Sequence, residues 1–279
     1  MKPRIIWPWV LGLGLLVGFG LWEWQKARPA RQGLPQLSEP LLTRLAHSIT
    51  VKVLVGQNWG SGVLVARQGQ TYTLVTNQHV LEGDSRTTAY QIRTPDGRLH
   101  PAKSLPLGHP NGDDVAALEF TSDRNYPLAC AQPHLPPVGA AVFAAGFPFP
   151  TEGQTDLGLV FTTGQVGLIL PKSLEGGYRL GYTNNVEKGM SGGPVLNGYG
   201  RLVALNGVHK NPLWGDPYRY ASGGTPAPEL RAQLADYSWG IPMTQVWQGL
   251  KVTAPPCEPA ASPGSKVTQD IILSPPRSR

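Results

Sequence analysis

The feature that most constrains the fold is a long series of short apolar runs that begins at residue 49. Glycine, proline and aspartate separate the runs, and the 279 residues include 34 glycines and 28 prolines. Many short strands between turns are typical of a barrel or a sandwich, and the absence of alternating long helices argues against a parallel α/β sheet. The predicted strands are 49–55, 62–66, 72–76, 89–93, 115–120 and 141–145, then 159–162, 165–170, 178–183, 194–196 and 202–207.

Between these two series lies a proline-rich stretch, residues 125–138, which is a plausible connection between two domains. Outside the strands we expect short helices at 40–48, 228–236 and 242–250, a polar linker at 25–39 and a flexible tail at 251–279. Cys130 and Cys257 fit one disulfide of an exported protein, and they fit two free thiols equally well.

The N-terminus contains 18 consecutive residues without a charge, 5–22. A segment of that length can cross the hydrocarbon layer of a membrane, and Lys2 and Arg4 precede it as in a signal-type start. Residues 1–24 are therefore predicted to be a transmembrane anchor or a signal. We favour an uncleaved anchor, because residues 27–30 supply no small-x-small cleavage site. The rest of the chain is then expected outside the cytoplasm, periplasmic or lumenal, and secreted if the segment is removed.

The formal charge of +6 does not indicate a nucleic-acid partner. Residues 1–31 carry a net charge of +4 and residues 250–279 a net charge of +2, so residues 32–249 are neutral overall. A nucleic-acid-binding domain needs an excess of basic residues on its folded surface. We therefore expect no nucleic-acid partner.

Ser191 stands in the string Gly189-Met190-Ser191-Gly192-Gly193-Pro194, directly before the run 194–196. Serine is a poor nucleophile until a base removes its proton, and the resulting oxyanion needs fixed donors. Glycine at 189 leaves the backbone free to point the N–H groups of Gly189 and Ser191 into one oxyanion hole. Taken alone, the string fits a glycine-rich turn with an incidental serine equally well.

Two other polar residues border apolar runs. His79 follows the run 72–76, and a neutral imidazole is the usual base for a serine. Asp114 leads into the run 115–120, and a carboxylate there is costly to bury unless it accepts a hydrogen bond, such as one from that base. Taken singly, His79 fits a structural histidine and Asp114 fits an Asx turn.

The order of these residues along the chain separates two hydrolase folds. Gly-x-Ser-x-Gly also matches the nucleophile elbow of α/β-hydrolases, but that fold requires an acid and then a histidine after the serine. His209 is the only histidine after Ser191, and no histidine follows Asp216, so the required order of acid and then histidine is not met. A strand rather than a helix is also predicted after Ser191. The order His79, Asp114, Ser191 fits the arrangement in which the first two lie on one β-barrel and the serine on another.

With these motifs the chain resembles trypsin-like serine peptidases of the chymotrypsin fold, of the HtrA-type branch, over residues 45–245. The single anchor and the Gly240-Ile241-Pro242 ending also resemble cyanobacterial trypsin-like peptidases. The resemblance rests on Gly60-Ser61-Gly62-Val63, Thr76-Asn77-Gln78-His79-Val80, Asp114-Val115-Ala116 and Gly189-Met190-Ser191-Gly192-Gly193-Pro194, supported by Ala145-Gly146-Phe147-Pro148 and Thr163-Gly164-Gln165-Val166.

The resemblance implies an all-β fold of two antiparallel six-stranded barrels with short helices, preceded by the N-terminal transmembrane helix. The peptidase domain would span 40–250, with barrels at about 45–125 and 138–245. It also implies a serine endopeptidase with no cofactor and no metal, acting on peptides or unfolded proteins. His79, Asp114 and Ser191 would be catalytic, the N–H groups of Gly189 and Ser191 would form the oxyanion hole, and Asn185 and Asn206 would bind substrate.

Departures from the family pattern restrict what is carried over. Met190 stands where animal trypsins usually have an aspartate that pairs with a newly cut N-terminus, so activation by that route is not expected. No PDZ domain is expected after the barrels, and residues 208–227 form a polar and aromatic insertion near the expected substrate cleft. The rival interpretations are a catalytically silent peptide- or partner-binding module and an esterase on the same fold.

Overall fold

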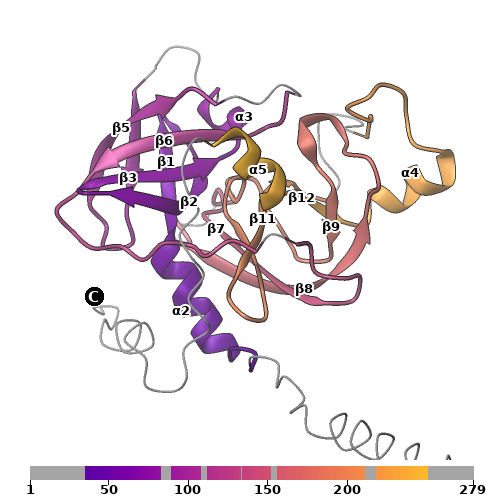
Figure 1. Cartoon of the computed structure of the whole chain (residues 1–279), viewed down its shortest axis with the longest axis horizontal. Helices are drawn as coiled ribbons and strands as arrows, with labels where there is room; N and C mark the ends of the chain where they lie inside the picture. Colours follow the sequence, from indigo (N-terminus) through magenta and orange to yellow (C-terminus); the bar gives the residue numbers. More distant parts are fainter. Residues whose placement is uncertain are drawn as a thin grey trace, which may run out of the picture. The chain divides into compact units, whose positions relative to one another are not determined.

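The computed structural model describes residues 35–82, 89–107, 112–132, 134–151, 156–210 and 218–250, and its strands form two closed six-stranded antiparallel barrels (Figure 1). This arrangement confirms the predicted all-β, chymotrypsin-like fold. The segment expected to cross the membrane, 5–22, lies outside the described residues, as do most of the linker and the whole tail. In the part of the chain that the structure describes, no helix has the length and apolar character needed to span a bilayer.

The first barrel has the strand order β1-β2-β3-β6-β5-β4 and the second the order β10-β11-β12-β9-β8-β7. The first contains β1 (Thr50–Val55), β2 (Asn58–Gln68), β3 (Thr71–Thr76), β4 (Tyr90–Arg93), β5 (Leu99–Leu105) and β6 (Ala116–Thr121). The second contains β7 (Ala141–Gly146), β8 (Val160–Ile169), β9 (Leu180–Tyr182), β10 (Pro194–Asn197), β11 (Leu202–Val208) and β12 (Ser238–Pro242). The helical segments are α2 (Glu39–Ile49), α3 (Gln78–Leu81), η1 (Glu175–Gly177), α4 (Pro228–Leu234) and α5 (Met243–Gly249).

The observed strands differ from the predicted ones in two respects. β5 and β12 were not predicted as strands: β5 is largely exposed to solvent, so its sequence LHPAKSL has no apolar run. The predicted strands 159–162 and 165–170 form one continuous strand, β8, which pairs with β7 through Gly164. Glycine is required there for packing rather than for a turn, because a Cβ at Gly164 would lie 2.3 Å from Oδ1 of Asn184.

Apolar side chains fill each barrel and also the space between the barrels. Successive side chains of a strand point to opposite faces. In β2, accordingly, Leu64 packs inside the first barrel while Val63 and Val65 pack in the cluster between the barrels. In β11, Ala204 packs inside the second barrel and Leu205 in the shared cluster. Because both faces are buried over 60–65 in β2 and 202–207 in β11, these stretches contain runs of apolar residues rather than an alternating pattern.

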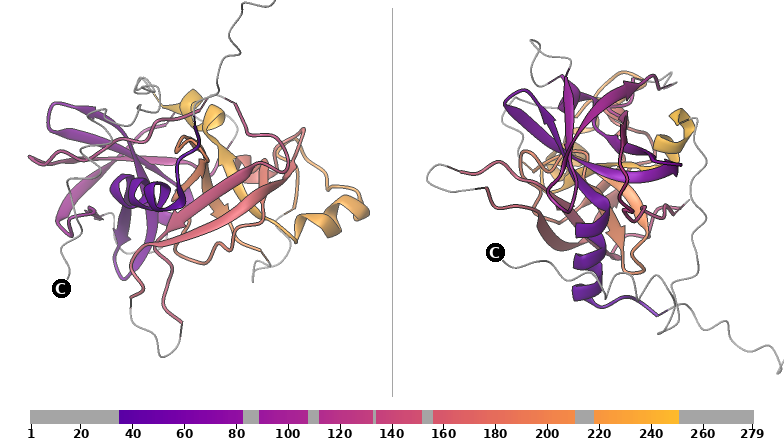
Figure 2. Two further views of the ribbon diagram at one scale, coloured as in Figure 1. Left: turned by 90° about the horizontal axis from the view of Figure 1, so that it is seen from below. Right: turned by 90° about the vertical axis from the view of Figure 1, so that its left-hand side faces the viewer.

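The two barrels lie side by side, as the views in Figures 1 and 2 agree, and the chain between them contacts both. The N–H of Ala129 donates to the carbonyl of Leu64 in β2 at 2.8 Å, and the N–H of Gln132 donates to the carbonyl of Leu202 in β11 at 2.9 Å. Cys130, between them, takes part in a disulfide, while Cys257 lies outside the described residues. This connection is therefore hydrogen-bonded to one strand of each barrel.

Candidate active site

His79 and Asp114 are brought together by the pairing of β3 with β6. Thr76, the last residue of β3, pairs with Ala116 of β6, so α3 after the one strand faces the residues before the other. Oδ2 of Asp114 lies 2.6 Å from Nδ1 of His79, and Oδ1 accepts the backbone N–H of His79 at 2.9 Å. An ionised carboxylate only accepts hydrogen bonds, so this contact places the proton of the neutral ring on Nδ1 and leaves Nε2 free to act as a base.

Asp114 is held from both barrels. Its backbone N–H donates to the carbonyl of Gly176 in η1 at 2.9 Å, and Nδ2 of Asn77 donates to its carbonyl at 2.8 Å. Its Oδ2 also accepts a hydrogen bond from the hydroxyl of Tyr178. The carboxylate therefore has three donors, which offset the cost of removing it from water. No sequence motif pointed to Tyr178, which lies 64 residues away from Asp114.

Ser191 lies in the loop before β10, and this loop packs directly against the end of β3. The N–H of Ser61 in β2 donates to the Ser191 carbonyl at 2.8 Å, and a Cβ on Gly192 would come within 3.0 Å of the Cα of Thr76. Among the described residues, the hydroxyl of Ser191 donates to the carbonyl of Gly207 at 3.1 Å and to no other group. The loop thus places Ser191 close to the His79 segment, with the hydroxyl turned toward Gly207 rather than His79.

The N–H of Gly189 is oriented by the carbonyl of its own peptide group. That carbonyl belongs to Lys188 and accepts the N–H of Phe149 at 2.8 Å. In a trans peptide the N–H points opposite to the C=O, and the described chain contains no cis bond. The next carbonyl, that of Gly189 itself, is held by the hydroxyl of the fully buried Ser61 at 2.9 Å. The loop conformation around Gly189 is therefore fixed on both sides.

The N–H of Ser191 is oriented in the same way. The carbonyl of Met190 accepts the N–H of Gly193 at 3.1 Å and Nδ2 of Asn206 at 3.4 Å. The Ser191 N–H consequently points away from these donors. Within the described ranges neither this N–H nor that of Gly189 has a hydrogen-bond acceptor. Two free, fixed donors two residues apart are what a developing oxyanion requires.

Asn206 does not occupy the surface position expected for a substrate-binding residue. Its side chain is fully buried: Oδ1 accepts the hydroxyl of Tyr182 at 2.7 Å, and Nδ2 donates to the carbonyl of Ala145 at 2.9 Å as well as to Met190. Asn206 therefore supports the serine loop from behind. Asn185 is exposed, and its Nδ2 donates to Oε1 of Glu187 at 3.0 Å.

A buried cation lies behind the segment that orients Gly189. Nζ of Lys52 is 2.7 Å from Oδ2 of Asp156 and 3.9 Å from the ring centre of Trp59. The Trp59 ring in turn stacks on the ring of Phe149, with centres 4.1 Å apart. Because the N–H of Phe149 donates to the Lys188 carbonyl, this cluster supports the peptide group that contains the Gly189 N–H.

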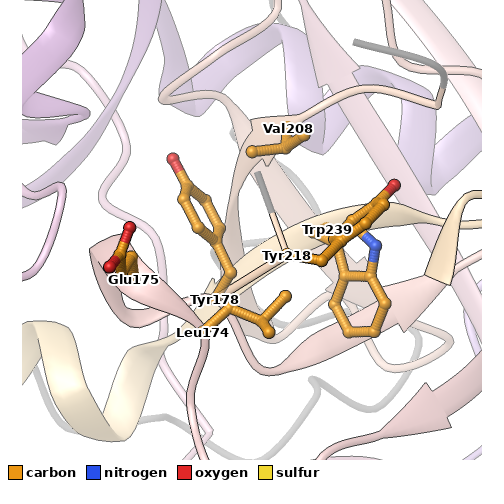
Figure 3. Close-up of a pocket in the computed structure, with 6 residues that line it drawn as sticks. All are labelled: Leu174, Glu175, Tyr178, Val208, Tyr218 and Trp239. Carbon is orange, nitrogen blue, oxygen red and sulfur yellow. The ribbon is translucent and has the colours of Figure 1, made fainter. Parts of the chain in front are cut away.

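A pocket of about 160 Å³ opens beside Gly207, the residue that holds the Ser191 hydroxyl. Figure 3 shows its lining residues, with the ring of Tyr178 between Glu175 and Val208; the full set is Leu174, Glu175, Tyr178, Val208, Tyr218 and Trp239. The expected insertion 208–227 contributes Val208 and Tyr218, while residues 211–217 lie outside the described part. Sequence reasoning missed the pocket because its walls come from separate segments, none of which carries a motif.

Over the residues that the structure describes, no group of three or more His, Cys, Asp or Glu side chains is placed to hold a metal ion.

Known proteins share both the sequence and the fold of this region. Residues 60–205 match the family described as "Trypsin-like peptidase domain". The serine endoprotease DegS of Escherichia coli K12 is 29% identical over 150 residues, which cover 53% of this chain and 39% of DegS. The periplasmic pH-dependent serine endoprotease DegQ of the same organism is 30% identical over 181 residues, covering 64% of this chain and 37% of DegQ. The chain thus spans about two fifths of the length of these relatives.

A crystal structure of a serine endoprotease from Yersinia pestis superposes with a TM-score of 0.53 and 20% identity, covering 77% of this chain and 65% of that one. At this identity the superposition supports the two-barrel fold, and the family match over residues 60–205 supports membership. The chain therefore belongs to the trypsin-like peptidase domain family, and so to the serine-type peptidases, with the HtrA-type relatives that its motifs predicted.

Proposed function

We propose that the chain is a serine endopeptidase that hydrolyses peptide bonds through Ser191, His79 and Asp114. The observation that carries the proposal is the pairing of His79 Nδ1 with Asp114, which leaves Nε2 of the ring available as a base. The serine loop packs against Thr76, three residues before His79. The Ser191 hydroxyl must first rotate away from the Gly207 carbonyl, which requires a change of one side-chain torsion.

The reaction then follows from these groups. Nε2 of His79 removes the proton of Ser191 as Oγ attacks the substrate carbonyl, and Asp114 stabilises the imidazolium that forms. The N–H groups of Gly189 and Ser191 donate to the oxyanion of the tetrahedral intermediate. The imidazolium passes its proton to the leaving amine, and water, activated by the same imidazole, releases the acyl group from Ser191.

The hydrogen bond of Ser191 to Gly207 is also compatible with a silent binding module, so the test must separate the two functions. We expect a fluorophosphonate probe to label Ser191 of the full chain, and we expect the same protein to cleave an unfolded casein substrate. Ser191→Ala and His79→Gln should each lower peptide hydrolysis by at least about 10³-fold. A folded wild-type protein that the probe does not label would refute the peptidase; hydrolysis of esters with no cleavage of casein would indicate an esterase.

We further propose that residues 40–250 act as the peptidase domain, outside the cytoplasm and attached to the membrane through residues 5–22. The uncharged length of that segment and the periplasmic relative DegQ support this location. The expected substrates are peptides or unfolded proteins. A C-terminal reporter enzyme that is active only outside the cytoplasm should be active on this chain, and activity of a cytosolic reporter instead would contradict the location.

A further inference from the structure

The carboxylate of Asp114 receives a hydrogen bond from the opposite barrel. Asp114 lies two residues before β6 of the first barrel, whereas Tyr178 lies between η1 and β9 in the second. The hydroxyl of Tyr178 donates to Oδ2 of Asp114, the oxygen that also contacts Nδ1 of His79. We propose that Tyr178 is a positioning residue of the triad, which holds the Asp114 carboxylate toward His79 from across the barrel interface. This inference rests on the proposed function.

The Tyr178 ring fits between two backbone segments because both of them carry a glycine where they face the ring. A Cβ on Gly207 would lie 2.0 Å from Cε1 of Tyr178 and 2.8 Å from its hydroxyl oxygen. A Cβ on Gly176 would lie 2.7 Å from Cε2 on the other edge of the ring and 3.2 Å from Cβ of Asp114. The ring is therefore confined between two glycines. One of them, Gly207, also accepts the hydrogen bond of Ser191, so Tyr178 is in contact with both halves of the site.

Burial makes the hydroxyl a dependable donor. Tyr178 is 7% exposed, and a buried hydroxyl is costly unless it is hydrogen-bonded. Burial raises the pKa of Tyr178 well above its ordinary value, and the negative charge of Asp114 raises it further. The phenol consequently stays protonated at any pH at which a histidine base is active. Among the described residues, the other ionisable groups near it include Tyr182, Glu175 and Tyr218 on the pocket wall, and Asp113, whose carboxylate lies against Gly177.

The hydrogen bond from Tyr178 draws negative charge away from the oxygen that faces His79. Without it, Oδ2 would carry more negative charge and interact more strongly with a protonated imidazole, and only the two N–H groups of His79 would hold the carboxylate. Loss of the hydroxyl should therefore move the acid limb of the kcat/KM profile to higher pH and slow the step in which the imidazole must be correctly oriented. A residue that only fills space would change stability without moving that limb.

Tyr178→Phe in the full chain tests the proposal, because it keeps the ring that lines the pocket and removes the hydroxyl alone. We expect kcat to fall about 10- to 100-fold with little change in KM, and the acid limb to move up by about 0.5 to 1 pH unit. The matched control is Tyr126→Phe, which removes another tyrosine hydroxyl that donates to an aspartate, Asp96, at 3.0 Å, within the first barrel. That control should leave kcat and the acid limb as they are in the wild type.

A folded Tyr178→Phe protein with the kcat and the pH profile of the wild type would overturn the proposal. If Tyr178→Phe does not fold, Gly207→Ala replaces it, since the added methyl group displaces the ring; an unchanged acid limb would again overturn the proposal. Failure of the proposed function would look different, because the wild-type protein itself would then not react with fluorophosphonate. In that case the NMR signal of the His79 Nδ1 proton decides: we expect Tyr178→Phe to shift it, and an unchanged signal refutes the role of Tyr178.

Discussion

Gly189→Ala tests the oxyanion hole, because the structure shows both what the methyl group would meet and what it would move. Gly189 has φ of +95°, a conformation that costs an L-residue about 1 to 2 kcal/mol. The new Cβ would lie 2.5 Å from the carbonyl oxygen of Phe147 and 2.8 Å from Cδ2 of Phe149. Real Cβ atoms essentially never come closer than 3.0 Å to such an atom, so the peptide groups of Gly189 and Phe147 must move apart by at least 0.5 Å.

A donor stabilises the oxyanion only when it lies about 2.7 to 3.1 Å from it, and a movement of this size exceeds the width of that range. The Gly189 N–H would then no longer reach the oxyanion, while that of Ser191 would stay in place. Loss of one such donor lowers kcat by about 10² to 10³, or about 2.7 to 4 kcal/mol of transition-state stabilisation. We expect that loss for Gly189→Ala, together with a decrease of about 2 to 3 kcal/mol in the free energy of unfolding.

Gly139→Ala is the control for the conformational cost of placing an alanine at a positive φ. Gly139 has φ of +85°, and a Cβ there would meet no atom within 4 Å. It should lower the free energy of unfolding by about 1 to 2 kcal/mol and leave catalysis unchanged. The assay is the rate of fluorophosphonate labelling together with turnover of a peptide substrate, and urea unfolding gives the stability. If Gly189→Ala is acylated within about threefold of the rate of Gly139→Ala, its N–H is not an oxyanion donor and the assignment fails.

Two further predictions concern the groups that support the loop. Asn206→Ala leaves the buried Tyr182 hydroxyl without its acceptor and removes the side-chain donor from the carbonyls of Ala145 and Met190, so we expect a loss of about 3 to 5 kcal/mol in stability and slower acylation. Tyr182→Phe keeps the hydrogen bond from Asn206 to Met190 and should cost about 1 to 2 kcal/mol; equal acylation rates in the two variants would contradict the reasoning. The hydrogen bond from Lys52 lowers the pKa of Asp156 in the folded protein. The pair therefore stabilises the fold fully above the pKa of an aspartate in the unfolded chain, about 3.9. This contribution is lost as the pH falls through the lower pKa of Asp156 in the folded protein. Because Asp156 is 47% exposed, solvent screens the pair, and Asp156→Asn should cost only about 1 kcal/mol at pH 7 by urea unfolding. That difference should shrink below about pH 3, and a full difference at low pH would show that the carboxylate charge is not its source.

Local patterns in the sequence were sufficient for the parts of the fold and the site that depend on neighbouring residues. Apolar runs between turn residues predicted most strands, and the predicted catalytic residues stand next to such runs or in a glycine string. β5 was missed because an exposed strand has no apolar face to mark it. Asn206 was predicted to bind substrate, but its side chain is fully buried, and the direction of a side chain near a β-bulge depends on the local register.

The sequence alone determined the type of fold, the order of the candidate catalytic residues along the chain and the family to which the chain belongs. Each of these depends on short motifs of neighbouring residues. Only the tertiary structure decided which groups support them. Tyr178 contacts Asp114 across 64 residues, and Ser61 holds the Gly189 carbonyl across 128. Such contacts have no period and no motif, since they arise where two separately closed barrels pack against each other. The physical reason is that hydrogen bonds across this interface depend on the relative placement of the two barrels, which no local pattern encodes.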